Sequence, residues 1–216
     1  MDDNTEMLIG GVPEGYDGVV LSQLIEAGND VLFVARDDRR MAAVQASLRF
    51  FASTIEVIEF PAWDCLPYDR VSPKSDIVAA RIDALTNLVD TKGKQPRIIL
   101  TTVAALLQRV PARQTFEDSN MTCGKGEVTS RDRLLEFLEQ NGYGRSETVM
   151  EPGEYAIRGG IIDLFPPGVE EPLRLDFFGN DLDGIRRFEP FSQRTTGEAD
   201  SFILKPVNEI SLDEEA

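Results

Sequence analysis

Arginine, aspartate and phenylalanine alternate with apolar residues in the segment Leu173–Phe178 (LRLDFF). Because successive side chains of a strand point to opposite faces, Arg174, Asp176 and Phe178 share one face of the expected strand. Exposed arginine beside an aromatic ring is typical of hot spots in protein–protein interfaces. An internal Arg–Asp pair on a solvated sheet, with Phe178 covered by a loop, fits the same pattern. The residues alone leave both interpretations open.

A second arginine occurs in the segment YAIRG, residues 155–159. Alternation places Arg158 on the face opposite to Tyr155. If this strand pairs with the strand that carries Arg174, the two arginines converge beside Phe178. These side chains are therefore the candidate binding residues.

Catalytic and metal-binding chemistry finds little support in the composition. The chain has no histidine, which excludes Ser-His-Asp triads and histidine-ligated metals. Its two cysteines, Cys65 and Cys123, form no CxxC motif and are expected to be free thiols. We therefore predict no catalytic, cofactor-binding or metal-binding residues, and a chain that is not itself an enzyme.

The charge and hydropathy of the chain limit its partners and location. The 216 residues carry a formal net charge of −16, which opposes broad binding to a phosphate backbone but allows a local basic patch. No apolar run approaches the roughly 20 residues of a membrane span, and the first residues are acidic. We expect a cytoplasmic protein with no membrane contact.

The first half reads as α/β. Apolar runs at 7–12, 31–35, 55–60 and 97–102 predict strands, and helical patterns separate them. Such alternation is typical of parallel βαβ units. The continuous apolar run 31–35 predicts a strand covered on both faces.

A phosphate-binding loop would follow the first of these strands. The sequence there is GGVPEGYDG, residues 10–18, which has glycines but no Lys, Ser or Thr. Phosphate loops need that Lys and Ser/Thr, and Glu14 and Asp17 would repel an anion. We therefore expect no nucleotide hydrolysis by this segment.

Beyond residue 115 the pattern changes to one helix followed by short strands, which predicts a compact α+β unit. A last strand at 202–207 has no local partner, so we expect either that it returns to the first domain or that the chain is a fragment of a larger protein. The loop 60–73 contains Trp63, Tyr68 and three prolines. Its aromatic rings could line a binding groove or pin the loop to its own domain.

Several stretches together resemble the N-terminal region of the bacterial transcription-repair coupling factors, the Mfd family. They are FPAWDCLPYDRVSP, LTTVAALLQRVP, YAIRGGIIDLFPPG, PLRLDFFGNDLDGIRRFEPFSQRT and PVNEISLDEEA. That region is similar to domains 1a, 2 and 1b of the repair protein UvrB. The resemblance implies domain 1a at 1–118 with a degenerate P-loop, domain 2 at 119–197, and the start of domain 1b at 198–216.

The resemblance also implies a function. Domain 2 would recruit UvrA by mimicking UvrB, with Arg158, Arg174, Asp176 and Phe178 as the contact residues. One departure is that UvrB has FRVRG where this chain has YAIRG, so Ala156 replaces an arginine. No cofactor is expected in this fragment, because ATP and Mg²⁺ would belong to motor domains outside it. The intact family member would also engage its own C-terminal domain, RNA polymerase and DNA.

Two alternatives accompany this interpretation. The chain could be a structural or autoinhibitory unit that docks within a larger translocase, in which case the Arg174 and Phe178 face would contact a neighbouring domain. It could also be a nucleotide-binding enzyme of the UvrB type, which the missing Lys and Ser/Thr oppose.

Overall fold

The computed structural model describes residues 8–13, 15–65, 73–90, 95–117, 119–125 and 130–209. These residues divide into two compact units. The first comprises the described residues up to 59 and those from 95 to 107, and the second comprises the others from 60 onward. No helix in these ranges is long and apolar enough to cross a membrane.

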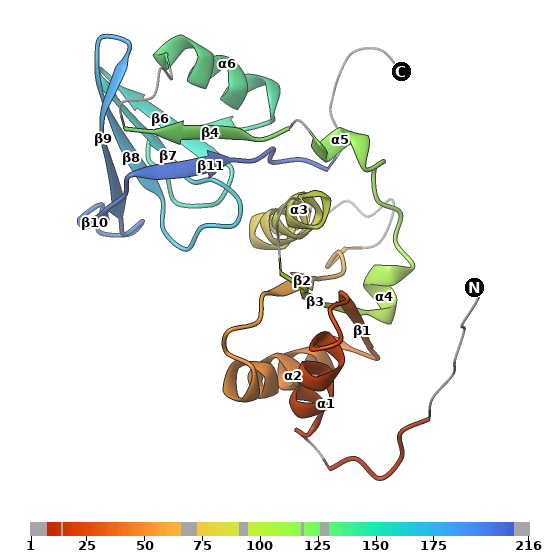
Figure 1. Ribbon diagram of the computed structural model, residues 1–216. Coiled ribbons are helices and arrows are strands. Elements are labelled where there is room, and N and C mark those ends of the chain that lie inside the picture. Colours follow the sequence, from red (N-terminus) through yellow and green to blue (C-terminus); the bar gives the residue numbers. More distant parts are fainter. Residues whose placement is uncertain are drawn as a thin grey trace. The chain divides into compact units, whose positions relative to one another are not determined.

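The first unit is an α/β layer structure (Figure 1). Its elements are α1 (Asp17–Ile25), β1 (Val31–Ala35), α2 (Asp38–Phe51), β2 (Val57–Phe60), β3 (Ile98–Thr102) and α4 (Val103–Leu106). The sheet order is β1-β3-β2, and β1 and β3 are parallel. Asp37 starts α2, because its carboxylate accepts a hydrogen bond from the Arg40 amide at 2.8 Å. The predicted α/β class with parallel strands is confirmed.

The predicted first strand does not form. Residues 8–12 are exposed and have no strand partner, and Met7 lies outside the described residues. Gly11 has a φ of 70°, in the left-handed region, which interrupts the extended conformation that a strand needs. The prediction from apolar composition was therefore wrong here.

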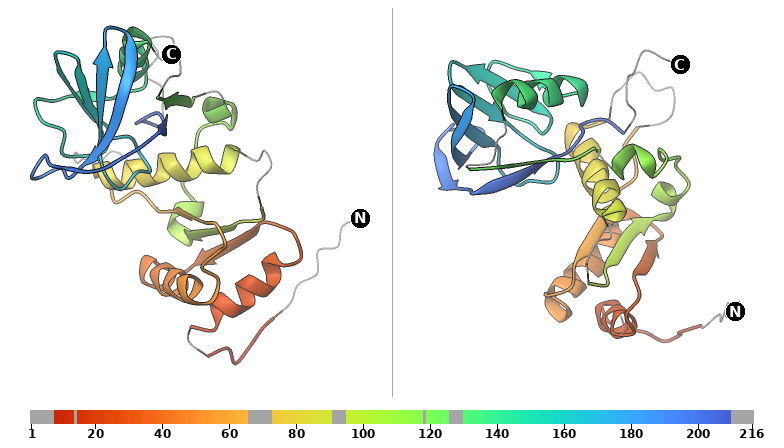
Figure 2. Two further views of the ribbon diagram at one scale, coloured as in Figure 1. Left: turned by 60° about the vertical axis from the view of Figure 1, so that its left-hand side comes forward. Right: turned by 45° about the horizontal axis from the view of Figure 1, so that its top comes forward.

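Strand β1 is covered on one face only. Helices α1 and α2 lie together on one side of the sheet (Figures 1 and 2), where they form a core with alternate residues of β1 and β3. Leu32 and Val34, which alternate with those residues, are exposed. The predicted burial of both faces was wrong, because α1 and α2 both pack against the same face.

The second unit contains a larger, mostly antiparallel sheet. Its order is β10-β9-β8-β7-β6-β5, and only β5 and β6 are parallel. The elements of this unit are α3 (Ser75–Val89), α5 (Gln114–Glu117), β4 (Met121–Gly124), α6 (Arg131–Gln140), β5 (Gly144–Arg145), β6 (Glu154–Arg158), β7 (Ile161–Leu164), β8 (Leu173–Phe178), β9 (Asp181–Phe188), β10 (Thr195–Glu198) and β11 (Ser201–Leu204). Helix α3, which the sequence assigned to the first domain, is grouped with this unit.

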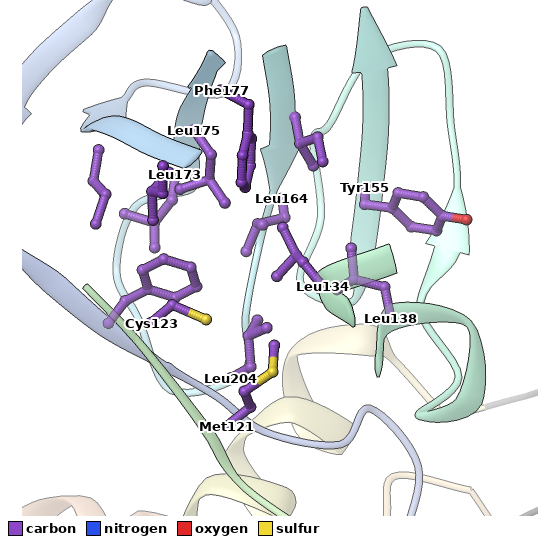
Figure 3. Close-up of a cluster of buried hydrophobic side chains, with 14 of the residues drawn as sticks. Met121, Cys123, Leu134, Leu138, Tyr155, Leu164, Leu173, Leu175, Phe177 and Leu204 are labelled. Carbon is purple, nitrogen blue, oxygen red and sulfur yellow. The ribbon is translucent and has the colours of Figure 1, made fainter. Parts of the chain in front are cut away.

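One face of the six-stranded sheet packs against α6 and against the two-stranded sheet β11-β4 (Figure 3). Leu134 and Leu138 of α6 are fully buried against Leu164 and Leu175 of the sheet. Burying such leucines stabilises the fold by about 1.5–3 kcal/mol each. Ser130 caps α6 by accepting a hydrogen bond from the Arg133 amide at 3.2 Å. This face therefore carries the larger core, and a smaller buried cluster that includes Ala156 and Phe188 lies on the opposite face.

The last strand differs from the prediction. Strand β11 pairs with β4, so it stays beside the six-stranded sheet and does not join the parallel sheet. The apolar side chains of both strands explain this pairing, because Phe202, Leu204, Met121 and Cys123 share the core. Residues that follow the strand do contact α3, through ion pairs from Lys205 and Glu209.

A β-bulge interrupts the pairing of β8 with β9. Asp176 is opposite Gly184, whereas Phe177 is opposite Leu182, which leaves Asp183 as an extra residue. Leu182 and Ile185, three positions apart, both reach the core as a result. Bulges of this kind increase local twist and redirect nearby side chains.

Candidate protein-interaction surface

The predicted alternation in β8 is confirmed. Leu173, Leu175 and Phe177 are buried in the core, while Phe178 is 84% exposed at the end of the strand. Because Arg174 and Asp176 lie on the same side of β8 as Phe178, the three residues belong to the sheet face away from α6.

The predicted pairing of the two arginine-bearing strands needs a correction. Strand β7 lies between β6 and β8, so Arg158 and Arg174 are not on neighbouring strands. Asp163 of β7 is opposite Ala156 on one side and Arg174 on the other. The two arginines still converge, because both reach this one carboxylate.

Asp163 is the centre of the cluster. Arg174 holds it with two parallel hydrogen bonds, Nε to Oδ1 at 2.7 Å and Nη2 to Oδ2 at 2.8 Å. The Asp163 side chain is only 1% exposed, and the Arg174 guanidinium lies 4.7 Å from the Phe188 ring centroid. The hydrogen bond to Asp163 raises the pKa of Arg174, so this guanidinium remains charged.

Arg158 is held more loosely. Its Nη1 lies 3.6 Å from Oδ2 of Asp163, and its Nη2 donates to the backbone oxygen of Glu147 at 2.6 Å. The Arg158 side chain is 48% exposed, against 16% for Arg174. Arg158 therefore presents more of its charge to solvent, while Arg174 mainly organises the cluster.

A second ion pair completes this face. Arg186 of β9 donates from Nη2 to both carboxylate oxygens of Asp176, at 3.0 and 2.7 Å. We call five charged residues on this side of strands β6 to β9 the arginine face: Arg158, Asp163, Arg174, Asp176 and Arg186.

Sequence reasoning missed Asp163 and Arg186. Asp163 is a single acid inside the apolar run IIDLF, and a lone carboxylate in a buried strand requires a cationic partner. That signal could have identified it. Arg186 was hidden by the bulge, because plain alternation does not predict its face.

The arrangement suits recognition of another protein. Its carboxylates are all paired with arginines, and the described residues contain no group of three potential metal ligands. Two positive side chains, Arg158 and Arg186, remain partly exposed on the same sheet face as the exposed ring of Phe178. Arginine with an aromatic ring is the composition enriched at the energetic centre of interfaces.

A different arginine, Arg81, holds the loop that contains Trp63 in place. Arg81 of α3 is fully buried, and its Cζ lies 4.3 Å from the ring centroid of Phe60 and 4.4 Å from that of Trp63. It also pairs with Glu209 and donates to the Pro61 oxygen at 2.7 Å. The ring of Trp63 thus packs on Arg81 and holds its loop against α3; Tyr68 lies outside the described residues.

The position expected for a phosphate loop is occupied by internal contacts. The Gly18 amide, at the start of α1, donates to Ser47 Oγ at 3.2 Å. Asp17 pairs with Arg40 at 2.6 Å. Glu14 lies outside the described residues.

Comparison with known proteins places this surface in a family. Residues 121–209 match the UvrB interaction domain. Over 211 residues, which is 98% of this chain, the sequence is 35% identical to the transcription-repair-coupling factor of Haemophilus influenzae. The identity is 32% to the Escherichia coli factor over 98% of the chain, and 29% to the Bacillus subtilis factor over 96%.

The chain spans only 17–18% of the length of these relatives. The matched segment 121–209 includes every residue of the arginine face and Phe178. The resemblance to the transcription-repair coupling factors is thereby confirmed, and residues 121–209 are similar to the UvrB interaction domain.

Proposed function

We propose that this chain recruits UvrA in transcription-coupled nucleotide excision repair, by mimicking the UvrA-binding surface of UvrB. The observation that carries the proposal is that the arginine face and the exposed Phe178 lie together inside a UvrB interaction domain. The opposite face of the same sheet is filled by the larger core, so a partner can reach this sheet only through the exposed side chains of the arginine face and Phe178.

The proposed contact is electrostatic at its centre and apolar at its edge. Arg158 would meet an acidic group of UvrA directly, because it is half-exposed and its own ion pair is long. Arg174 and Asp176 would act through the pairs that orient them, and Phe178 would fill an apolar pocket. Complementary charge mainly raises the association rate and the specificity, while the buried ring supplies affinity.

Nucleotide hydrolysis does not form part of the proposal. The segment 10–18 lacks the Lys and Ser/Thr of a working phosphate loop. At the start of α1, the Gly18 amide already donates to Ser47, and Asp17 places a carboxylate close by. These contacts support a degenerate P-loop. We expect no ATP turnover when the chain is incubated with ATP and Mg²⁺.

The relatives are far longer than this chain. Any further activities of a complete protein would therefore belong to segments that this chain does not span. A motor that uses ATP and Mg²⁺, and contacts with RNA polymerase and DNA, would lie in other parts. A C-terminal domain of the same protein could cover the arginine face until UvrA displaces it. This internal docking is the second candidate, and it would use the same side chains.

The test is a calorimetric titration of the chain into UvrA from the same organism. We expect saturable binding that Phe178→Ala weakens at least tenfold. Phe50→Ala is the matched control, because Phe50 is 79% exposed but belongs to α2 of the first unit. Absence of heat and of co-elution at tens of micromolar would contradict UvrA recruitment and leave internal docking as the better account.

A further inference from the structure

A second phenylalanine of the same unit is exposed to solvent. Phe191 is 85% exposed and lies in the turn between β9 and β10. Single exposed apolar residues are common on protein surfaces and need no explanation by themselves. The turn that carries this one is unusually constrained, and it contacts the arginine face.

Hydrogen bonds fix the backbone on both sides of Phe191. The Glu189 carboxylate accepts from the amides of Phe191 at 2.9 Å and Ser192 at 2.6 Å. The Gln193 amide donates to the Glu189 oxygen at 2.8 Å, and the Glu189 amide donates to the Arg194 oxygen at 2.9 Å. A side chain presented by such an ordered turn loses little conformational entropy on binding.

Gln193 joins this turn to the arginine face. It has a φ of 59°, which is uncommon for a residue other than glycine. Its Nε2 donates to the Pro190 oxygen at 2.6 Å and to the Val149 oxygen at 3.2 Å. Arg174 in turn donates to its Oε1 at 3.3 Å and to its backbone oxygen at 3.4 Å. The turn and the arginine that organises the cluster therefore form one hydrogen-bonded assembly.

The two exposed phenylalanines lie at opposite ends of this assembly. The Phe188 amide donates to the Pro172 oxygen, which places the Phe191 turn at the beginning of β8. Phe178 is at the other end of that strand, opposite Asp181. Six residues of strand span about 20 Å. A standard interface buries roughly 800 Å² per partner, a patch about 28 Å across, so one partner can cover both rings.

We infer that Phe191 is a second aromatic anchor of the UvrA-binding surface. The inference rests on the proposed function and adds a residue that the resemblance did not supply. The surface of UvrA would then offer two apolar pockets about 20 Å apart, on either side of an acidic patch. That patch would face Arg158 and Arg186, which expose positive charge on a chain whose net charge is −16.

The experiment compares Phe191→Ala, Phe178→Ala, the double variant and Phe50→Ala in calorimetric titrations into UvrA. We expect Phe191→Ala to weaken binding at least tenfold and Phe50→Ala to leave it unchanged. The double variant should lose about the product of the single effects, because distant sites act independently. Circular dichroism and melting temperatures should match those of the parent chain, because both rings are exposed.

The outcomes separate the two ideas. If Phe178→Ala weakens binding and Phe191→Ala does not, the second anchor is wrong and UvrA recruitment stands. If the unsubstituted chain fails to bind UvrA, both are wrong. Phe191→Asp provides a further check that does not depend on the size of a lost contact, because a carboxylate placed in an apolar pocket beside an acidic patch should weaken binding more than alanine does.

Discussion

Two arginines of the second unit have similar partners and different surroundings. Arg81 and Arg174 each pair with a carboxylate through two guanidinium nitrogens, and each lies over an aromatic ring. Arg81 is fully buried between two rings, whereas Arg174 lies on a sheet face beside the half-exposed Arg158. The same kind of Arg–carboxylate pair therefore stabilises the fold at Arg81 and orients a solvent-accessible face at Arg174. The difference lies in the access of solvent to the two sites.

The largest effect should come from the buried arginine. Arg81→Met leaves the Glu209 carboxylate, which is 6% exposed, without its partner, and this should lower the free energy of unfolding by about 3–5 kcal/mol. Trp63 is the only tryptophan, and its ring packs on Arg81, so its fluorescence reports on this site. Combining Arg81→Met with Glu209→Gln should recover part of the loss. A single variant as stable as the parent would contradict the structural role.

Asp163 should affect both stability and binding. Asp163→Asn keeps the shape but removes the charge that both Arg158 and Arg174 share. Hydrogen bonds to charged groups contribute about 1.5–3 kcal/mol, so we expect urea unfolding to show a loss in that range. Affinity for UvrA should fall as well, because both guanidinium groups lose their orientation. Unchanged affinity in the folded variant would show that the arginines act without this positioning.

Arg158 should separate binding from folding. Arg158→Ala removes a half-exposed pair, which contributes at most about 1 kcal/mol to stability. We expect the melting temperature to fall by no more than about 4 °C and binding to UvrA to weaken roughly tenfold. Arg145→Ala is the matched control: Arg145 is exposed on the same sheet, but it pairs with Tyr155, whose side chain enters the core on the other face. Equal losses for the two variants would argue for a nonspecific charge effect.

The smallest effect concerns pH. Hydrogen bonds from Ser192 and from the Phe191 amide lower the pKa of Glu189. A lowered pKa in the folded state means that the carboxylate supports the turn at neutral pH and loses this role only as the pH falls through that pKa, on the acid side of the ordinary glutamate pKa. The amide resonances of Phe191 and Ser192 should therefore shift in an NMR titration only on the acid side of the ordinary glutamate pKa, with no change near neutral pH. A transition centred above pH 5 would contradict the assignment.

Much of this surface could be predicted from local sequence, because alternation in a strand needs no knowledge of its neighbours. Arg174, Asp176 and Phe178 were placed on one face by that rule, and the structure agrees. Strand order could not be obtained in this way: β7 separates the two arginine-bearing strands, and its Asp163 joins them. The Arg81 cluster joins residues more than a hundred positions apart, which no local pattern reports.

The first unit shows the opposite case. Apolar composition predicted a strand at 7–12, but a strand also needs a neighbouring strand and an extended backbone. The left-handed conformation of Gly11 interrupts the extended backbone. Composition likewise predicted that both faces of β1 would be buried. In the structure, α1 and α2 pack against one face only, and Leu32 and Val34 on the other face are exposed. Tertiary packing decides both outcomes.

The bulge in the β8–β9 hairpin gives the surface an adjustable geometry. Asp183 is the extra residue, and removing it would restore strict alternation, with Leu182 and Ile185 still facing the core. Such a deletion changes no side chain of the arginine face, yet it would relax the local twist and turn the tip that carries Phe178. Related chains could therefore diverge in partner preference by changing the length of this hairpin by one residue, with the contact residues themselves left intact.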